Sequence, residues 1–118
     1  MAKISVVLLA GTESHGDLGR LVNAISLVKE AKEAGDEVEL VFDGAGTEWI
    51  PELEDEEHKM HRPYRAIKDE VAGACEFCAG AFGVKEAVRE AGITFLSEFE
   101  GHPSLRRRIE QGYRVVTF

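Results

Sequence analysis

Both cysteines of this 118-residue chain lie in one short segment, Cys75-Glu76-Phe77-Cys78. The apolar run 71–74 precedes the segment and a helical pattern follows it, so the sulfurs are expected where a strand ends and a helix begins. A helix N-terminus stabilises a thiolate, which is the reactive form of cysteine. The segment therefore predicts thiol chemistry, and we expect Cys75 to be the more reactive of the pair.

The elements that must position this pair follow a repeating pattern. Helical patterns close with glycine at Gly35, Gly92 and Gly112, and each glycine precedes a strand-like run. The expected strands cover residues 6–10, 37–42, 71–74, 93–96 and 113–118. Strands that alternate with helices favour an α/β domain over residues 1–118, with three α/β/α layers and a mostly parallel sheet of about five strands.

Helix starts and an unusual insertion complete the expected organisation. We expect a first helix from an N-cap at Asp17, with Leu18, Leu21, Val22, Ile25 and Val28 on its apolar face. A second helix is expected after the cysteines as far as Ala91, and a third from Pro103. The charged segment 44–69 shows only weak helical periodicity, so we interpret it as an excursion over the carboxyl edge of the sheet.

Loops after parallel strands open at one edge of the sheet, and this rule selects the candidate pocket residues. Besides the two cysteines, the pocket is expected to contain Glu13, His15, Asp43, Glu48 and Trp49. Each of these residues taken alone also fits an ordinary role, such as a turn at Asp43 or a core lid at Trp49. The neighbouring glycine-rich loops lack the sequence of a P-loop or of a dinucleotide-binding loop, so no cofactor is expected.

The order and spacing of several short motifs resemble the DsrE-like (DsrE/DsrF/TusD-like) sulfur-relay family across essentially the whole chain. The motifs are MAKISVVLLAG, KEAGDEVELVFDGAGTEW, VAGACEFCAGAFGV, EAGI, EGHPSL and EQGYRVVTF. The resemblance implies a flavodoxin-like α/β domain, assembly into oligomers, and a cysteine that carries sulfur as a persulfide between donor and acceptor proteins.

The resemblance also bears on individual residues. It implies a carrier at Cys75, which stands eight residues before Gly83-Val84, and matches Cys78 to a second cysteine of other branches. Relay members carry arginine just before that glycine, where this chain has Phe82. In the segment that resembles the strand-to-helix corner of the family, His102 is a candidate proton partner of the cysteines or a helix-capping residue. A sulfurtransferase activity is therefore one interpretation of the chain.

Two other function classes remain open. The first is a non-catalytic, zinc-stabilised or ligand-binding oligomer. A tetrahedral zinc site could be supplied by an HxxH pair, His58 and His61, and by the CxxC pair, Cys75 and Cys78. Two histidines on an acidic surface loop are the simpler explanation. A small thiol oxidoreductase also fits CxxC, but none of the three prolines is an obvious cis-proline counterpart.

Charge and hydropathy restrict the partners. Fourteen basic and 22 acidic residues give a net charge of −8, which disfavours nucleic acid as a partner. No apolar run approaches the length of a membrane span, and two closely spaced cysteines without an export signal suggest the cytoplasm. The acidic run 54–57, the arginines at 106–108 and the family resemblance lead us to expect a homo-oligomer, a trimer or hexamer, with the segment 44–69 near an interface.

Overall fold

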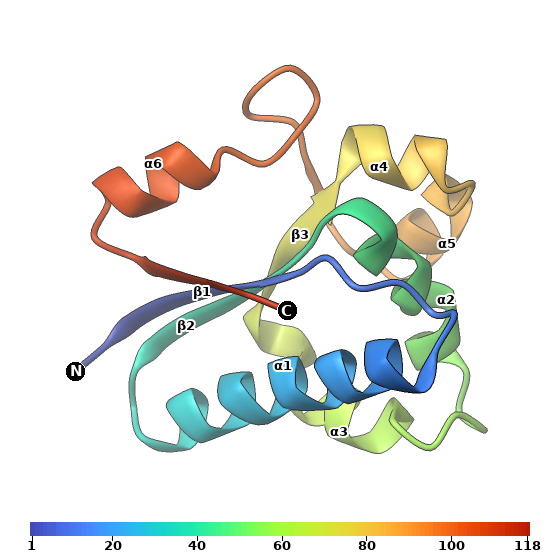
Figure 1. Ribbon diagram of the computed structural model, residues 1–118, viewed down its shortest axis with the longest axis horizontal. Coiled ribbons are helices and arrows are strands. Elements are labelled where there is room, and N and C mark those ends of the chain that lie inside the picture. Colours follow the sequence, from blue (N-terminus) through green and yellow to red (C-terminus); the bar gives the residue numbers. More distant parts are fainter.

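The strand-like runs form a single all-parallel sheet in the computed structural model, which describes residues 1–118 (Figure 1). Its strands are β1 (Lys3–Leu8), β2 (Glu37–Phe42), β3 (Val71–Cys75), β4 (Phe95–Leu96) and β5 (Arg114–Thr117). They lie in the order β4-β3-β2-β1-β5, and every neighbouring pair is parallel. The expected fold class, a flavodoxin-like α/β/α domain with about five strands, is confirmed.

Helices cover both faces of the sheet, but unequally. They are α1 (His15–Glu33), α2 (Trp49–Glu54), α3 (His61–Ile67), α4 (Glu76–Ala81), α5 (Lys85–Glu90) and α6 (Leu105–Glu110). The crossovers from β1 through β4 run in one direction and are right-handed, so their helices share a face. The return to β5 runs backwards and puts α6 on the opposite face (Figure 1). None of these helices has the length and apolar character needed to cross a membrane.

The main core lies between the sheet and the helices of the first face. Alternate residues of β1 and β2, including Val6, Leu8, Leu40 and Phe42, pack in one cluster with the buried side of α1. Ala24 belongs to that buried side, whereas Val22 is exposed, so Ala24 takes the place expected for Val22 on the apolar face of this helix.

The segment 44–69 contributes to this core and is more than an excursion over the edge. It forms a 3₁₀ turn (Gly44–Glu48), α2, α3 and most of a second 3₁₀ turn (Lys68–Glu70), which together make the crossover from β2 to β3. Five of its apolar residues are buried in the main cluster: Trp49, Ile50, Leu53, Tyr64 and Ile67. The weak periodicity therefore marks two short helices that pack on the sheet, and the dense charge belongs to their outer sides.

Three helix boundaries differ from the sequence-based expectation. The N-cap of α1 is Ser14, whose Oγ accepts a hydrogen bond from the Asp17 amide at 3.1 Å, so Asp17 lies inside the first turn. The helix after the cysteines is divided into α4 and α5 because Gly83 adopts a positive φ of 71°. The last helix starts at Leu105 with Ser104 as its cap, not at Pro103.

A buried ion-pair network attaches α6 to its face of the sheet. Arg108 donates from Nε to Glu39 on β2 and from an Nη atom to Glu98, each at 2.6 Å. Glu98 also accepts a hydrogen bond from the Ser104 amide, so the arginine fixes the connection that leads from β4 into α6. Its neighbours Arg106 and Arg107 pair with Glu110 and Glu98 in the same chain.

Close packing at Gly46 offers a direct test of how the first 3₁₀ turn is seated against β1. A Cβ atom on this residue would stand 2.0 Å from the Leu8 carbonyl oxygen, so Gly46→Ala requires backbone movement. We expect a loss of about 2–4 kcal/mol in the free energy of unfolding, measured in urea.

Gly19 is the matched control, because it is exposed within α1 and a Cβ atom there would meet nothing within 4 Å. Gly19→Ala should raise the free energy of unfolding by about 0.5–1 kcal/mol, since alanine has the higher helix propensity. Equal effects of the two substitutions would contradict the described contact between Gly46 and Leu8.

Candidate functional site

Four side chains with metal-binding or nucleophilic atoms meet at the carboxyl edge of the sheet: Asp43, Cys75, Cys78 and His102. Asp43 follows β2, Cys75 ends β3, Cys78 lies in the first turn of α4, and His102 belongs to the connection between β4 and α6. One terminal atom from each residue lies within 4.8 Å of the other three. Since these residues are far apart in the sequence, except for the two cysteines, the parallel topology is what unites them.

The Cys75 thiol is buried at the start of α4. Its sulfur accepts a hydrogen bond from the Cys78 amide at 3.3 Å and therefore acts as the N-cap of the helix. Burial nevertheless raises the pKa of the thiol to about 12, with further contributions from the Cys78 side chain and the Asp43 carboxylate, while the amide hydrogen bond opposes them. The amide at the helix start favours the thiolate as expected, but burial outweighs it, so the expectation of a lowered pKa for Cys75 is wrong.

Cys78 is the more accessible of the two cysteines, because it is half-buried whereas Cys75 has no exposed surface. Its Sγ–H donates to Asp43 Oδ1 at 3.6 Å, and the same oxygen accepts from the Gly44 amide at 2.8 Å. Both cysteines are free thiols. The pair therefore has one protected sulfur and one sulfur that reagents can reach first.

His102 reaches the cysteines from a tight turn. Phe99 and His102 exchange two backbone hydrogen bonds, and the residues between them, Glu100 and Gly101, have positive φ values of 50° and 85°. The Gly101 carbonyl accepts a hydrogen bond from the Phe77 amide at 3.0 Å, which joins this turn to α4. As a result, His102 Nδ1 lies 3.3 Å from Cys75 Sγ.

Two exposed phenylalanines, Phe77 and Phe99, belong to the segments that meet at this turn. The Phe77 ring lies 5.0 Å from the His102 imidazole, centroid to centroid, and limits how that ring can rotate. Phe77 and Phe99 are nevertheless 60% and 62% exposed, so neither is a core residue. An exposed aromatic ring, that of Phe77, therefore lies directly beside His102.

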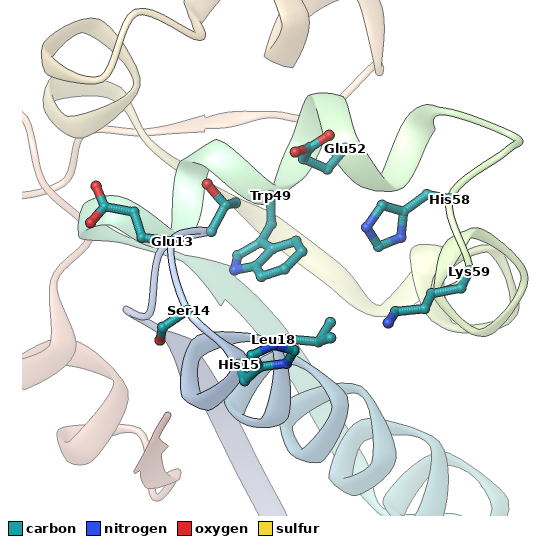
Figure 2. Close-up of a pocket in the computed structure, with 9 residues that line it drawn as sticks. Glu13, Ser14, His15, Leu18, Trp49, Glu52, His58 and Lys59 are labelled. Carbon is teal, nitrogen blue, oxygen red and sulfur yellow. The ribbon is translucent and has the colours of Figure 1, made fainter.

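Three of the expected pocket residues, Glu13, His15 and Trp49, lie in a separate hollow of about 350 Å³ (Figure 2). The Trp49 indole donates to the Ala10 carbonyl at 3.0 Å, and its ring meets the His58 ring edge-on at 6.0 Å. The hollow is completed by six residues that sequence reasoning did not place there: Thr12, Ser14, Leu18, Glu52, His58 and Lys59. The helical spacing from Trp49 to Glu52 is the one sequence signal that could have placed Glu52.

The remaining candidates do not belong to the four-residue cluster. The Glu48 carboxylate lies against Gly11, in the loop after β1. His58 Nδ1 accepts a hydrogen bond from the Met60 amide, and His61 Nδ1 lies 2.7 Å from the Leu53 carbonyl. The two histidines therefore stabilise the segment between α2 and α3, and the structure does not bring them to Cys75 and Cys78.

The cluster has the groups needed for reversible sulfur chemistry. A thiolate is the nucleophile in thiol and persulfide exchange, and a neighbouring imidazole or carboxylate can take the thiol proton. His102 is placed to do so for Cys75, and Asp43 for Cys78. The same four groups are also ligands that bind divalent metals.

Comparison with known proteins identifies relatives but no activity. No family model matches the chain. Uncharacterized protein MJ0733 of Methanocaldococcus jannaschii is 30% identical over 96 residues, which cover 81% of this chain and 78% of that protein. A conserved protein of unknown function from Bacteroides thetaiotaomicron, BT1422, has a structure similar to this one, with a TM-score of 0.64, 14% identity, and coverage of 97% of this chain and 94% of that one.

The chain belongs to the same family as MJ0733, because the identity extends over most of both sequences. The likeness to BT1422 shows a shared fold.

Alkylation should distinguish the two thiols. At neutral pH, iodoacetamide is expected to modify Cys78 in the folded protein and to leave Cys75 largely unmodified. A pKa of about 12 reduces the thiolate fraction of Cys75 roughly a thousandfold relative to an ordinary thiol. Raising the pH toward 12 should increase the rate at Cys75 continuously.

Peptide mapping by mass spectrometry assigns the modified residue, and Cys75→Ser and Cys78→Ser serve as matched controls. Denaturant should make both cysteines of the wild type react alike. Modification of Cys75 as fast as Cys78 in the folded protein would contradict the described burial.

Proposed function

We propose that this protein is a DsrE-like sulfur carrier, which accepts sulfur as a cysteine persulfide and passes it to a partner protein. The observation that carries the proposal is the pair of free thiols at the carboxyl edge of the sheet, with His102 Nδ1 beside the sulfur of Cys75 and the Asp43 carboxylate accepting from Cys78. The resemblance to the sulfur-relay family supports it independently, through the order of its motifs. On this account the protein acts as a sulfurtransferase without a cofactor.

Cys78 is the proposed entry point because it is the accessible sulfur. Its thiolate attacks the outer sulfur of a donor persulfide, so that a new S–S bond forms on Cys78 while the S–S bond of the donor breaks. The donor leaves as a thiolate, which takes up a proton equivalent to the one that Cys78 lost. An acceptor thiolate repeats the exchange in the forward direction, and no oxidant or reductant is consumed.

Cys75 gives the carried sulfur a sheltered position. Transfer from Cys78 to Cys75 exchanges one persulfide for another, with His102 as the acceptor of the Cys75 proton. A persulfide on the buried sulfur would be protected from other thiols and from oxidants. The pair would therefore combine exchange with partners and temporary storage.

The partners on this proposal are a sulfur donor protein and an acceptor protein in the cytoplasm, where thiols stay reduced. The exposed Phe77 and Phe99 beside the site suit contact with another protein surface. We further propose a homo-oligomer, a trimer or hexamer, in which neighbouring chains approach the mouth of the site. Arg106 and Arg107 are exposed and could contribute to such contacts, whereas Arg108 is buried within its own chain.

Intact-mass measurement after incubation with a polysulfide donor tests this function. The reduced wild-type protein should gain the mass of one or more sulfur atoms, and a thiol reductant should remove it. Cys78→Ser should lose most of the gain at short times, because the entry thiol is missing. Cys75→Ser should still load but should release the sulfur faster to an added thiol.

Glu13→Gln is the control, because Glu13 lies in the separate hollow and should not alter loading. If the wild type gains no reducible sulfur, the carrier function is wrong. Formation of an intramolecular disulfide in place of the adduct would support the thiol oxidoreductase alternative.

A further inference from the structure

We infer that Asp43, Cys75, Cys78 and His102 form a binding site for a zinc ion. This inference does not depend on sulfur transfer, although it uses the same two sulfurs. It replaces the histidine ligands suggested by the HxxH spacing with residues that the fold brings to the cysteines.

The donor set fits zinc in kind and number. Zinc in proteins prefers four ligands drawn from cysteine sulfur, histidine nitrogen and carboxylate oxygen. The cluster supplies two sulfurs, one nitrogen and one oxygen. Two thiolates and one carboxylate would more than offset the charge of a divalent cation, and the acidic chain as a whole attracts cations.

The distances fit tetrahedral coordination. Zinc–ligand bonds of about 2.0–2.3 Å at tetrahedral angles put neighbouring ligand atoms about 3.3–3.8 Å apart. Cys75 Sγ lies 3.3 Å from His102 Nδ1, and Cys78 Sγ lies 3.6 Å from Asp43 Oδ1. Because one ligand atom from each residue lies within 4.8 Å of the other three, metal binding requires the widest pair to close by at most about 1.0–1.5 Å.

The ligands are already held by their surroundings. Asp43 is oriented by the Gly44 amide, while Cys75 caps α4. The turn that carries His102 is fixed by the backbone hydrogen bonds of Phe99 and His102 and by the Phe77 amide. Little conformational freedom is therefore lost on binding, as a preorganised metal site requires.

A bound metal would also affect the proposed carrier. Zinc and a persulfide would compete for the same sulfurs, so zinc would hold both thiols in an inactive state. This consequence rests on the proposed function, whereas the metal site itself does not.

The test is a zinc titration of the reduced, metal-free protein without any sulfur donor, in competition with a chromophoric chelator. One zinc ion per chain is expected. His102→Gln and Asp43→Asn should each weaken binding by more than about tenfold, a loss that even outer-shell partners of a metal can cause. The Asp43→Asn substitution retains a side-chain oxygen that can accept from the Gly44 amide, so this variant should keep the fold.

His58→Gln and His61→Gln are the matched controls and should bind as the wild type does. Cobalt gives a second measurement, because thiolate ligands produce a charge-transfer band that Cys78→Ser should weaken and His58→Gln should leave unchanged. Circular dichroism confirms that each variant is folded.

Zinc binding that is absent from the wild type would overturn the inference. So would binding that is lost in His58→Gln or His61→Gln but retained in His102→Gln. Sulfur loading without zinc binding would refute the metal site but not the carrier function. Zinc binding without sulfur loading would refute the carrier function but not the metal site.

Discussion

The parallel arrangement of the strands is the constraint on which the rest of the structure depends. Because every strand runs in the same direction, β2 and β3 both end at one edge and deliver Asp43 and Cys75 to neighbouring positions. The tight packing of Gly46 against Leu8 brings the segment after β2 close to β1. The strand arrangement therefore determines which residues meet at the site.

The return from β4 to β5 completes the site and determines its chemistry. This connection crosses to the opposite face, where Arg108 ties α6 to Glu39 and to Glu98. The same connection carries the turn that covers Cys75 and presents His102 to its sulfur. Burial by this turn outweighs the favourable amide hydrogen bond, so the helix start does not by itself make Cys75 a thiolate.

Much of the fold could be predicted because its signals are local. Gly35, Gly92 and Gly112 end helices with positive φ, as expected, and each leads into a strand. Helix boundaries were less predictable. Ser14 and Asp17 are both good capping residues, and only the local backbone geometry decides between them.

The site was predictable only where it follows directly from strand ends. Asp43 and the cysteines meet at the carboxyl edge of the parallel sheet, as expected. His102 was a candidate only because its segment resembles a corner of the sulfur-relay family. Trp49 instead turns to the Ala10 carbonyl, which puts it in the hollow that Glu13 and His15 also line. The burial of Cys75 depends on a turn 26 residues further along the chain, so no local pattern could reveal it.

The central claim is that Asp43 and His102 act together with the two thiols. Its most direct test is the pH dependence of the rate of sulfur loading in the wild type, Asp43→Asn and His102→Gln, with His58→Gln as the control. The account predicts that both cluster variants change the pH profile while the control reproduces that of the wild type. Four coincident profiles would contradict it.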